Sequence, residues 1–157
     1  MRIAVASDLS GFPLKQAIIE YLSGRQDIEV TDFGIEDEDH PKPYIEQAPK
    51  VASAVQTGTV DKGILICGTG QGMAIAANKH KGIYACVATD IFSGERASII
   101  NNANILTLGG WITAPFHGVQ IVEAWLSVGF TEKMEFKKEF LTRNYQLVQE
   151  MEEKHFK

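Results

Sequence analysis

The sequence predicts an α/β protein: a three-layer α/β/α, Rossmann-like domain with a five-stranded parallel sheet and an extra C-terminal helix. Short apolar segments rich in β-branched residues alternate with longer segments whose apolar residues recur at helical spacing. Strands that alternate with helices pair in parallel, because each helix carries the chain back to the start of the next strand. No linker, repeat or low-complexity stretch interrupts the alternation, so residues 1–157 are expected to form one domain.

The five strands are predicted at residues 2–7, 28–32, 63–67, 83–88 and 105–108. The helices between them are predicted over 14–22, 48–55, from Met73 onward, from Asp90 to about Ile100, and over 116–126. Pro13 suits the first turn of the first helix. A last helix is predicted from about 132 to 153 with an irregular apolar stripe, and it packs either on its own domain or on a partner subunit.

Composition narrows the classes of function. The hydrophobic fraction of 45% and charged fraction of 22% are those of an ordinary soluble globular protein. A formal net charge of -5 argues against nucleic acid or an anionic membrane as a partner. No run reaches the length of a membrane span, and the first residues form a strand pattern instead of a secretory signal, so a cytoplasmic location is expected. Cys67 and Cys86 fall on different predicted strands, which favours free thiols over a disulfide.

A glycine-rich turn follows the third predicted strand, and the sequence there is Cys67-Gly-Thr-Gly-Gln-Gly72. Glycines allow the backbone to approach a ligand closely and leave amide N–H groups pointing outward. The helix start behind the turn favours developing negative charge and the thiolate form of cysteine. Because parallel strands end at one edge of a sheet, Asp8, Asp90 and Gly109-Gly110 should lie at the same edge as Cys67. This combination predicts base chemistry that makes an oxyanion.

Simpler interpretations compete with each of these features. A lone cysteine is more often a buried core residue than a catalytic one, and Asp8 at a strand end serves equally well as a helix cap. The glycine turn departs from the dinucleotide-binding fingerprint because Met73 stands at the third glycine position, which weakens that reading without excluding it. The acidic run 36–39 is best explained as a solvated loop, and the four histidines lack metal-ligand spacing, so no metal is expected.

Several motifs in order resemble the type B ribose-5-phosphate isomerases, a family that includes the galactose-6-phosphate isomerase subunits. The resemblance covers roughly residues 1–130 and is carried by Asp8 with Ser10-Gly-Phe12, by Asp32-Phe-Gly34, by the segment 63–79, and by Asn101-Asn-Ala-Asn104. It implies that an aldose phosphate and its ketose are interconverted through a cis-enediolate. It also implies no cofactor, no metal, and homodimers or tetramers whose active sites are shared between subunits.

The resemblance also implies roles for individual residues. Cys67 would move the proton between C1 and C2, while Thr69 and Asp8 would assist ring opening and hydroxyl recognition. Tyr44 would line the pocket. The remaining groups, which would hold the enediolate oxygen, are the backbone amides of Gly68, Gly70, Gln71 and Gly72 together with Asn101.

The chain departs from the family at the groups that open the sugar ring and bind phosphate. Leu9 stands where the family has a phosphate-binding histidine, and Ile100 stands where it has a ring-opening histidine. The arginine-rich segment that grips phosphate aligns with 134–138, where Lys137 offers a point charge instead of a guanidinium fork. The expected function is an isomerase of the ribose 5-phosphate type. Two alternatives remain open: an isomerase for a tetrose or hexose phosphate, and a non-catalytic subunit or sugar-phosphate-binding regulator on the same fold.

Overall fold

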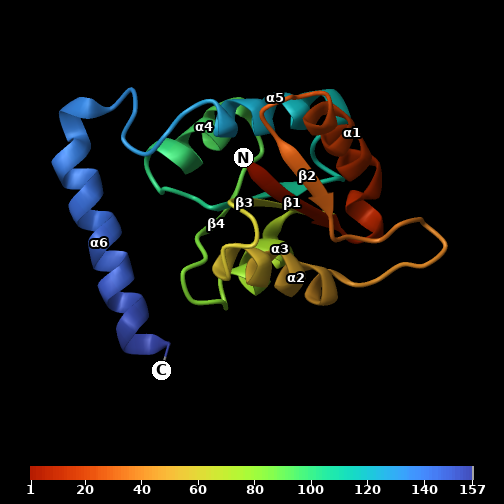
Figure 1. The fold of residues 1–157 in the computed structure, drawn as a ribbon, viewed down its shortest axis with the longest axis horizontal. Helices are drawn as coiled ribbons and strands as arrows, with labels where there is room; N and C mark the ends of the chain where they lie inside the picture. Colours follow the sequence, from red (N-terminus) through yellow and green to blue (C-terminus); the bar gives the residue numbers. More distant parts are fainter. Residues whose placement is uncertain (157) are drawn as a thin grey trace.

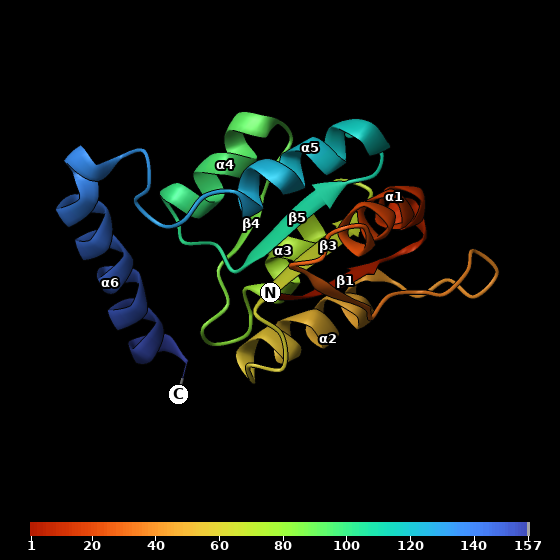
Figure 2. The same cartoon turned by 45° about the horizontal axis from the view of Figure 1, so that its top comes forward.

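The structure is a computed structural model that describes residues 1–156 (Figures 1 and 2). Its strands are β1 (Arg2–Ser7), β2 (Glu29–Asp32), β3 (Lys62–Cys67), β4 (Ala85–Val87) and β5 (Ile105–Gly109). Its α-helices are α1 (Phe12–Ser23), α2 (Tyr44–Gln56), α3 (Gln71–Ala77), α4 (Ile91–Ile99), α5 (Pro115–Leu126) and α6 (Lys138–His155). Two short 3-10 helices, η1 (Leu9–Gly11) and η2 (Glu135–Lys137), precede α1 and α6.

The strands form one parallel sheet in the order β2-β1-β3-β5-β4, which confirms the predicted fold class. The register places Ser7 beside Ile66 and Cys67 beside Gly109. The last residues of β1, β3 and β5 therefore meet at the carboxyl edge of the sheet. This edge carries the glycine turn.

Helices cover both faces of the sheet, as three layers require (Figure 2). Successive side chains of β1 point to opposite faces, so Ile3 and Val5 pack in the core beside α1 and α5, while Ala4 and Ala6 pack in the core beside α2 and α3. Both cores consist of apolar side chains that are almost completely buried. The helices that cover the two faces are thus the segments whose apolar residues recur at helical spacing in the sequence.

The structure shortens the fourth predicted strand. The segment 83–88 was expected to be a strand, but only Ala85–Val87 pairs with β5. The N–H of Tyr84 donates to Asn104 Oδ1 at 2.8 Å, and the side-chain amide of Asn78 bonds both the N–H and the carbonyl of Ala85. Asparagine side chains therefore form the hydrogen bonds that a neighbouring strand would otherwise make with the backbone at the start of this segment.

The C-terminal helix begins six residues later than expected, at Lys138 instead of near Glu132. Thr131 and Lys133 have φ values of 65° and 60°, which lie in the left-handed region and cannot continue an α-helix. Glu132 instead accepts a hydrogen bond from the N–H of Gly129 at 2.7 Å. The predicted helix start near Glu132 is thus wrong because a turn occupies residues 129–134.

Helix α6 lies beside the β4 edge of the molecule, set apart from the two helical layers that cover the sheet (Figure 1). Leu141 is its only buried residue within the described part of the chain, and Phe140, Val148 and Met151 are exposed. Glu152 ties the helix to the body by accepting hydrogen bonds from the Gly82 N–H and from the Tyr84 hydroxyl, just before β4. Packing of this apolar stripe on a partner subunit stays a prediction.

Candidate active site

Cys67 ends β3 at the carboxyl edge of the sheet, and its sulfur meets the first amide of the following turn. The N–H of Gly70 donates a hydrogen bond to Cys67 Sγ at 3.2 Å. Gly70 achieves this with a φ of 79°, and a Cβ there would lie 3.0 Å from the carbonyl carbon of Leu108. Glycine is therefore required both by the conformation and by the space. The side chain of Cys67 is 6% exposed, so the sulfur is almost covered in the isolated chain.

The glycine turn also presents amide donors that the protein does not use. The N–H of Gln71 donates a long hydrogen bond of 3.4 Å to Thr69 Oγ1. Within residues 1–156, the N–H groups of Gly68, Thr69 and Gly72 have no acceptor in the protein. These three N–H groups belong to the turn that follows Cys67 and to the helix start behind it. They are available to a negatively charged oxygen. The sulfur and the free amides thus belong to one short segment, residues 67–72, at one edge of the sheet.

Three backbone segments touch at this edge. The N–H of Gly110 donates to the Cys67 carbonyl at 2.8 Å, and the N–H of Asp8 donates to the Ile66 carbonyl at 3.2 Å. A Cβ on Gly109 would lie 2.8 Å from the Cα of Thr69. The turns after β1, β3 and β5 are therefore packed at backbone distance, as expected from the parallel topology.

Asp8 caps η1, because its Oδ1 accepts a hydrogen bond from the N–H of Gly11 at 3.2 Å. Burial raises the pKa of the Asp8 carboxyl above its ordinary value, more than the hydrogen bonds from Gly11 and Ser10 lower it. A carboxyl that is half-buried beside Cys67 is suited to meet a substrate hydroxyl in addition to its capping role. Asp90, by contrast, caps α4 in a reciprocal pair with Ser93 and follows β4, which is separated from β3 by β5.

Two aromatic rings lie against the glycine turn. Tyr44 opens α2, and a Cβ on Gly72 would lie 3.1 Å from its ring, so the ring packs against the glycine turn. Trp111 was not among the predicted site residues. A Cβ on Gly68 would lie 2.6 Å from Trp111 Cε3, so the indole lies directly on the backbone next to Cys67. The available sequence signal was an aromatic residue placed directly after the Gly109-Gly110 turn.

Asn101 and Lys137 lie elsewhere in the chain. The turn that contains Asn101 leads into β5, and the N–H of Gly63 donates to the Asn104 carbonyl at the start of β3. Cys67 lies four residues further along the same strand, which corresponds to roughly 13 Å at the usual rise of a β-strand. Lys137 ends η2, just before α6. One chain therefore brings together the predicted residues 8, 44 and 67–72, but not Asn101 or Lys137.

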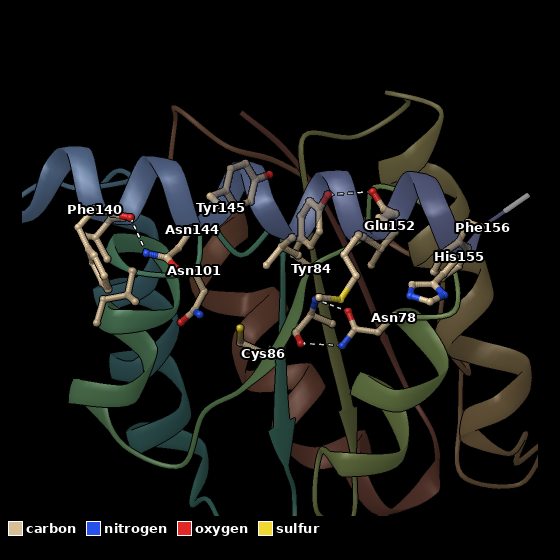
Figure 3. Close-up of a pocket in the computed structure, with 16 residues that line it drawn as sticks. Asn78, Tyr84, Cys86, Asn101, Phe140, Asn144, Tyr145, Glu152, His155 and Phe156 are labelled. Carbon is tan, nitrogen blue, oxygen red and sulfur yellow. Dashed lines mark hydrogen bonds between the residues drawn. The ribbon is translucent and has the colours of Figure 1, made fainter.

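A groove of about 620 Å³ separates α6 from the amino end of the sheet (Figure 3). In Figure 2 the β5 arrow points away from α6, so this groove and Cys67 lie at opposite ends of the strands. Asn101 and Ile100 line the groove together with Asn144 of α6, and Tyr84 Oη donates to Glu152 Oε2 across it at 2.9 Å. Cys86 is half-buried against this groove, and burial raises the pKa of its thiol.

Both cysteines are free thiols, as the sequence favoured. Residues 1–156 contain no group of three histidine, cysteine or acidic side chains arranged to hold a metal ion. Among the helices in this described range, none combines the length and the apolar character needed to cross a bilayer. The acidic run is a loop in which Asp37 Oδ1 bonds the ring of His40 at 2.8 Å.

Comparison with known proteins identifies the family. The Ribose/Galactose Isomerase family model matches residues 3–142. The chain is 46% identical over 154 residues to the 4-deoxy-4-sulfo-D-erythrose isomerase of Clostridium sp. (strain MSTE9), covering 98% of this chain and 96% of that protein. It is 45% identical to the ribose-5-P isomerase B of Listeria innocua, covering 83% and 87% of the two chains.

The solved structure of Clostridium thermocellum ribose-5-phosphate isomerase B superposes on this fold with a TM-score of 0.89 at 35% identity, covering 99% of each chain. The similarity thus extends beyond the glycine turn to the whole architecture, α6 included. The chain belongs to the ribose/galactose isomerase family and is an aldose–ketose isomerase.

Proposed function

We propose that this enzyme isomerises an open-chain four-carbon sugar with a terminal sulfonate, using Cys67 as the base. The observation that carries the substrate class is the match of almost the whole chain to a relative named as a 4-deoxy-4-sulfo-D-erythrose isomerase. The relative named as a ribose-5-P isomerase matches a smaller share of this chain, 83% against 98%. The substitutions at Ile100 and Leu9 support the same choice.

The chemistry of the sugar explains Ile100. Ribose 5-phosphate has a free hydroxyl on C4, which closes a five-membered ring that an isomerase must open before the proton transfer. A tetrose that bears a sulfonate on C4 has no hydroxyl there and stays open. The resemblance places a ring-opening histidine at position 100, whereas this chain has an isoleucine that lines the groove beside α6. An open-chain substrate removes the need for that histidine.

The charge of the anion supports a sulfonate. A sulfonate carries one negative charge near neutral pH, whereas a phosphate monoester carries about 1.5 to 2. The family's arginine-rich segment corresponds here to residues 134–138, in which the cations are Lys137 and Lys138. Lysine supplies a point charge without the bidentate fork that suits a phosphate. A singly charged sulfonate therefore needs fewer cationic groups in its binding site than a phosphate does.

The proposed reaction uses the sulfur and the free amides together. The Cys67 thiolate removes the proton from C2 of the aldose, and the electron pair of that bond forms the C1–C2 double bond while the carbonyl oxygen becomes an oxyanion. The N–H groups of the turn, those of Gly68 and Gly72 among them, stabilise this enediolate; a well-placed donor contributes on the order of 3 kcal/mol. The Cys67 thiol then returns the proton to C1, and the hydroxyl proton on O2 moves to O1, which leaves the ketose.

We infer that a second copy of the chain completes each site. Asn101 and Lys137 lie away from Cys67 of their own chain, so another subunit must supply them if they contact the substrate. The exposed Phe140, Val148 and Met151 on α6 provide apolar area for such an association.

The substrate proposal is tested by measuring kcat/KM for 4-deoxy-4-sulfoerythrose, erythrose 4-phosphate and ribose 5-phosphate with the wild-type enzyme. We expect the sulfotetrose to be turned over fastest and ribose 5-phosphate slowest. Faster turnover of ribose 5-phosphate than of either tetrose contradicts the proposal. Binding of sugars without any turnover contradicts it too, and supports the non-catalytic alternative.

A further inference from the structure

Trp111 is an exposed tryptophan held in a fixed place. Its side chain is 75% exposed, while Trp125, the other tryptophan, is completely buried. Tryptophan is enriched at binding interfaces, where its large flat ring contacts the partner. The backbone here is held firmly, because the Trp111 N–H donates to the Gly68 carbonyl at 3.0 Å.

The indole occupies the space that a side chain at position 68 would fill. Its ring carbons Cε3, Cδ2 and Cζ3 lie within 2.8 Å of the position a Gly68 Cβ would take. Gly68 directly follows Cys67, and its N–H is one of the free donors of the turn. The indole therefore borders the place where the reacting carbons must lie if Cys67 is the base.

We propose that Trp111 is a specificity-determining residue that forms the wall limiting the Cys67 pocket to extended, four-carbon sugars. This proposal rests on the function proposed above. In this proposal the flat indole face contacts the C–H groups of an extended chain and excludes a furanose ring or one further carbon. One carbon more or less in a closed pocket commonly changes kcat/KM by roughly 10- to 200-fold.

The test compares substrate selectivity in the wild type, Trp111→Phe and Trp111→Ala. The ratio of kcat/KM for ribose 5-phosphate to that for 4-deoxy-4-sulfoerythrose is expected to rise roughly tenfold or more in Trp111→Ala. It should rise less in Trp111→Phe, which keeps an aromatic wall. Phe116→Ala is the matched control, because Phe116 is 78% exposed and lies in the first turn of α5, shortly after the same backbone turn. Its ratio should equal that of the wild type.

Tryptophan fluorescence gives a second readout. Trp125 is inaccessible, so any change in emission when the sulfotetrose is added reports on Trp111 and should vanish in Trp111→Phe. If the wild type prefers the sulfotetrose and Trp111→Ala keeps the same selectivity ratio, the proposed role of Trp111 is wrong while the proposed substrate stands. A wild type that prefers ribose 5-phosphate instead overturns the proposed substrate. Dissociation of Trp111→Ala into monomers with unchanged selectivity contradicts the wall and identifies Trp111 as a subunit contact.

Discussion

The backbone N–H of Gly70 donates a hydrogen bond to Cys67 Sγ at 3.2 Å. The left-handed conformation of Gly70 folds the chain back so that its amide faces the sulfur three residues earlier. This hydrogen bond fixes the position of the sulfur relative to the backbone of the turn. In the proposed reaction, the same turn therefore contacts the base and supplies the donors for the oxyanion.

Replacing Gly70 with alanine should damage both stability and catalysis. Alanine at a φ of 79° costs roughly 1–2 kcal/mol, and its Cβ would crowd the Leu108 backbone. The shift of the turn should also move the Gly70 donor away from the sulfur and displace the neighbouring amides that the proposal assigns to the oxyanion, lowering kcat by about 10²-fold. Chemical unfolding and steady-state kinetics measure the two effects.

Gly58→Ala is the control for this substitution. Gly58 has a φ of 71° with nothing within 4 Å of a Cβ, and it lies between α2 and β3, at the end opposite Cys67. It should lose a similar stability and keep its kcat. Equal activity in both variants would show that the Gly70 donor has no part in catalysis.

The ion pair between the buried Lys15 and the exposed Asp32 anchors the loop after β2. Lys15 Nζ donates to Asp32 Oδ2 at 2.6 Å and to the Ile35 carbonyl at 2.5 Å, and the lysine side chain is completely buried. Lys15→Met should lower the free energy of unfolding by about 2 kcal/mol, because it removes the hydrogen bonds to Asp32 and to the Ile35 carbonyl while Asp32 stays accessible to water. Urea unfolding measures this loss. Arg25→Gln, which breaks an exposed pair with Asp27, should leave the urea midpoint almost unchanged.

Stability should rise in mild alkali because of Lys62. Its Nζ lies 4.2 Å from the centroid of the Trp125 ring, and burial lowers the pKa of Lys62 to about 8. The unfolded chain keeps the ordinary pKa of about 10.4, so between these values it binds more protons than the native state. The free energy of unfolding must then increase with pH, by on the order of 2 kcal/mol between pH 8 and pH 10.

The pH effect is isolated by subtracting the behaviour of Lys62→Met, which lacks the titrating group. Urea unfolding of both proteins at pH 7, 8, 9 and 10 gives the difference directly. A difference that stays constant across this range would mean that Lys62 titrates normally in the native state.

Mixing two inactive variants should restore activity if the site is shared between subunits. Cys67→Ala lacks the proposed base and Asn101→Ala lacks the proposed partner contribution. In a hybrid dimer, one site combines the intact Cys67 of one chain with the intact Asn101 of the other. After random exchange of subunits, about half of the dimers are hybrids, and each hybrid has one intact site out of two. About a quarter of the wild-type activity should therefore return. No recovery after unfolding and refolding of the mixture would contradict a shared site.

Much of the architecture could be predicted because each strand carries a clear local signal. The alternation of Ile3, Ala4, Val5 and Ala6 between two cores requires a sheet covered on both faces, and the parallel topology then brings Asp8 to the edge of Cys67. These features depend only on the periodicity of the segments and on the shared direction of the strands.

The missed features depend on side-chain contacts between separate segments or on local backbone conformations that the residue pattern does not indicate. The start of β4 is decided by the side chains of Asn78 and Asn104, and the start of α6 by positive φ at Thr131 and Lys133. The contact of Trp111 with Gly68 joins two turns some forty residues apart in the chain, and neither turn alone indicates it.

The most direct test of the account follows hydrogen at C1 during turnover in D₂O. With the wild type and with Cys86→Ser, mass spectrometry should find solvent deuterium on C1 of the ketose product, because the sulfur exchanges its proton with solvent before returning it. Cys67→Ser should keep its circular dichroism spectrum, lose about 10²- to 10⁴-fold in kcat, and incorporate no deuterium in the same time. A Cys67→Ser enzyme that turns over and exchanges at the rate of the wild type would contradict the proposed role of Cys67 as the base.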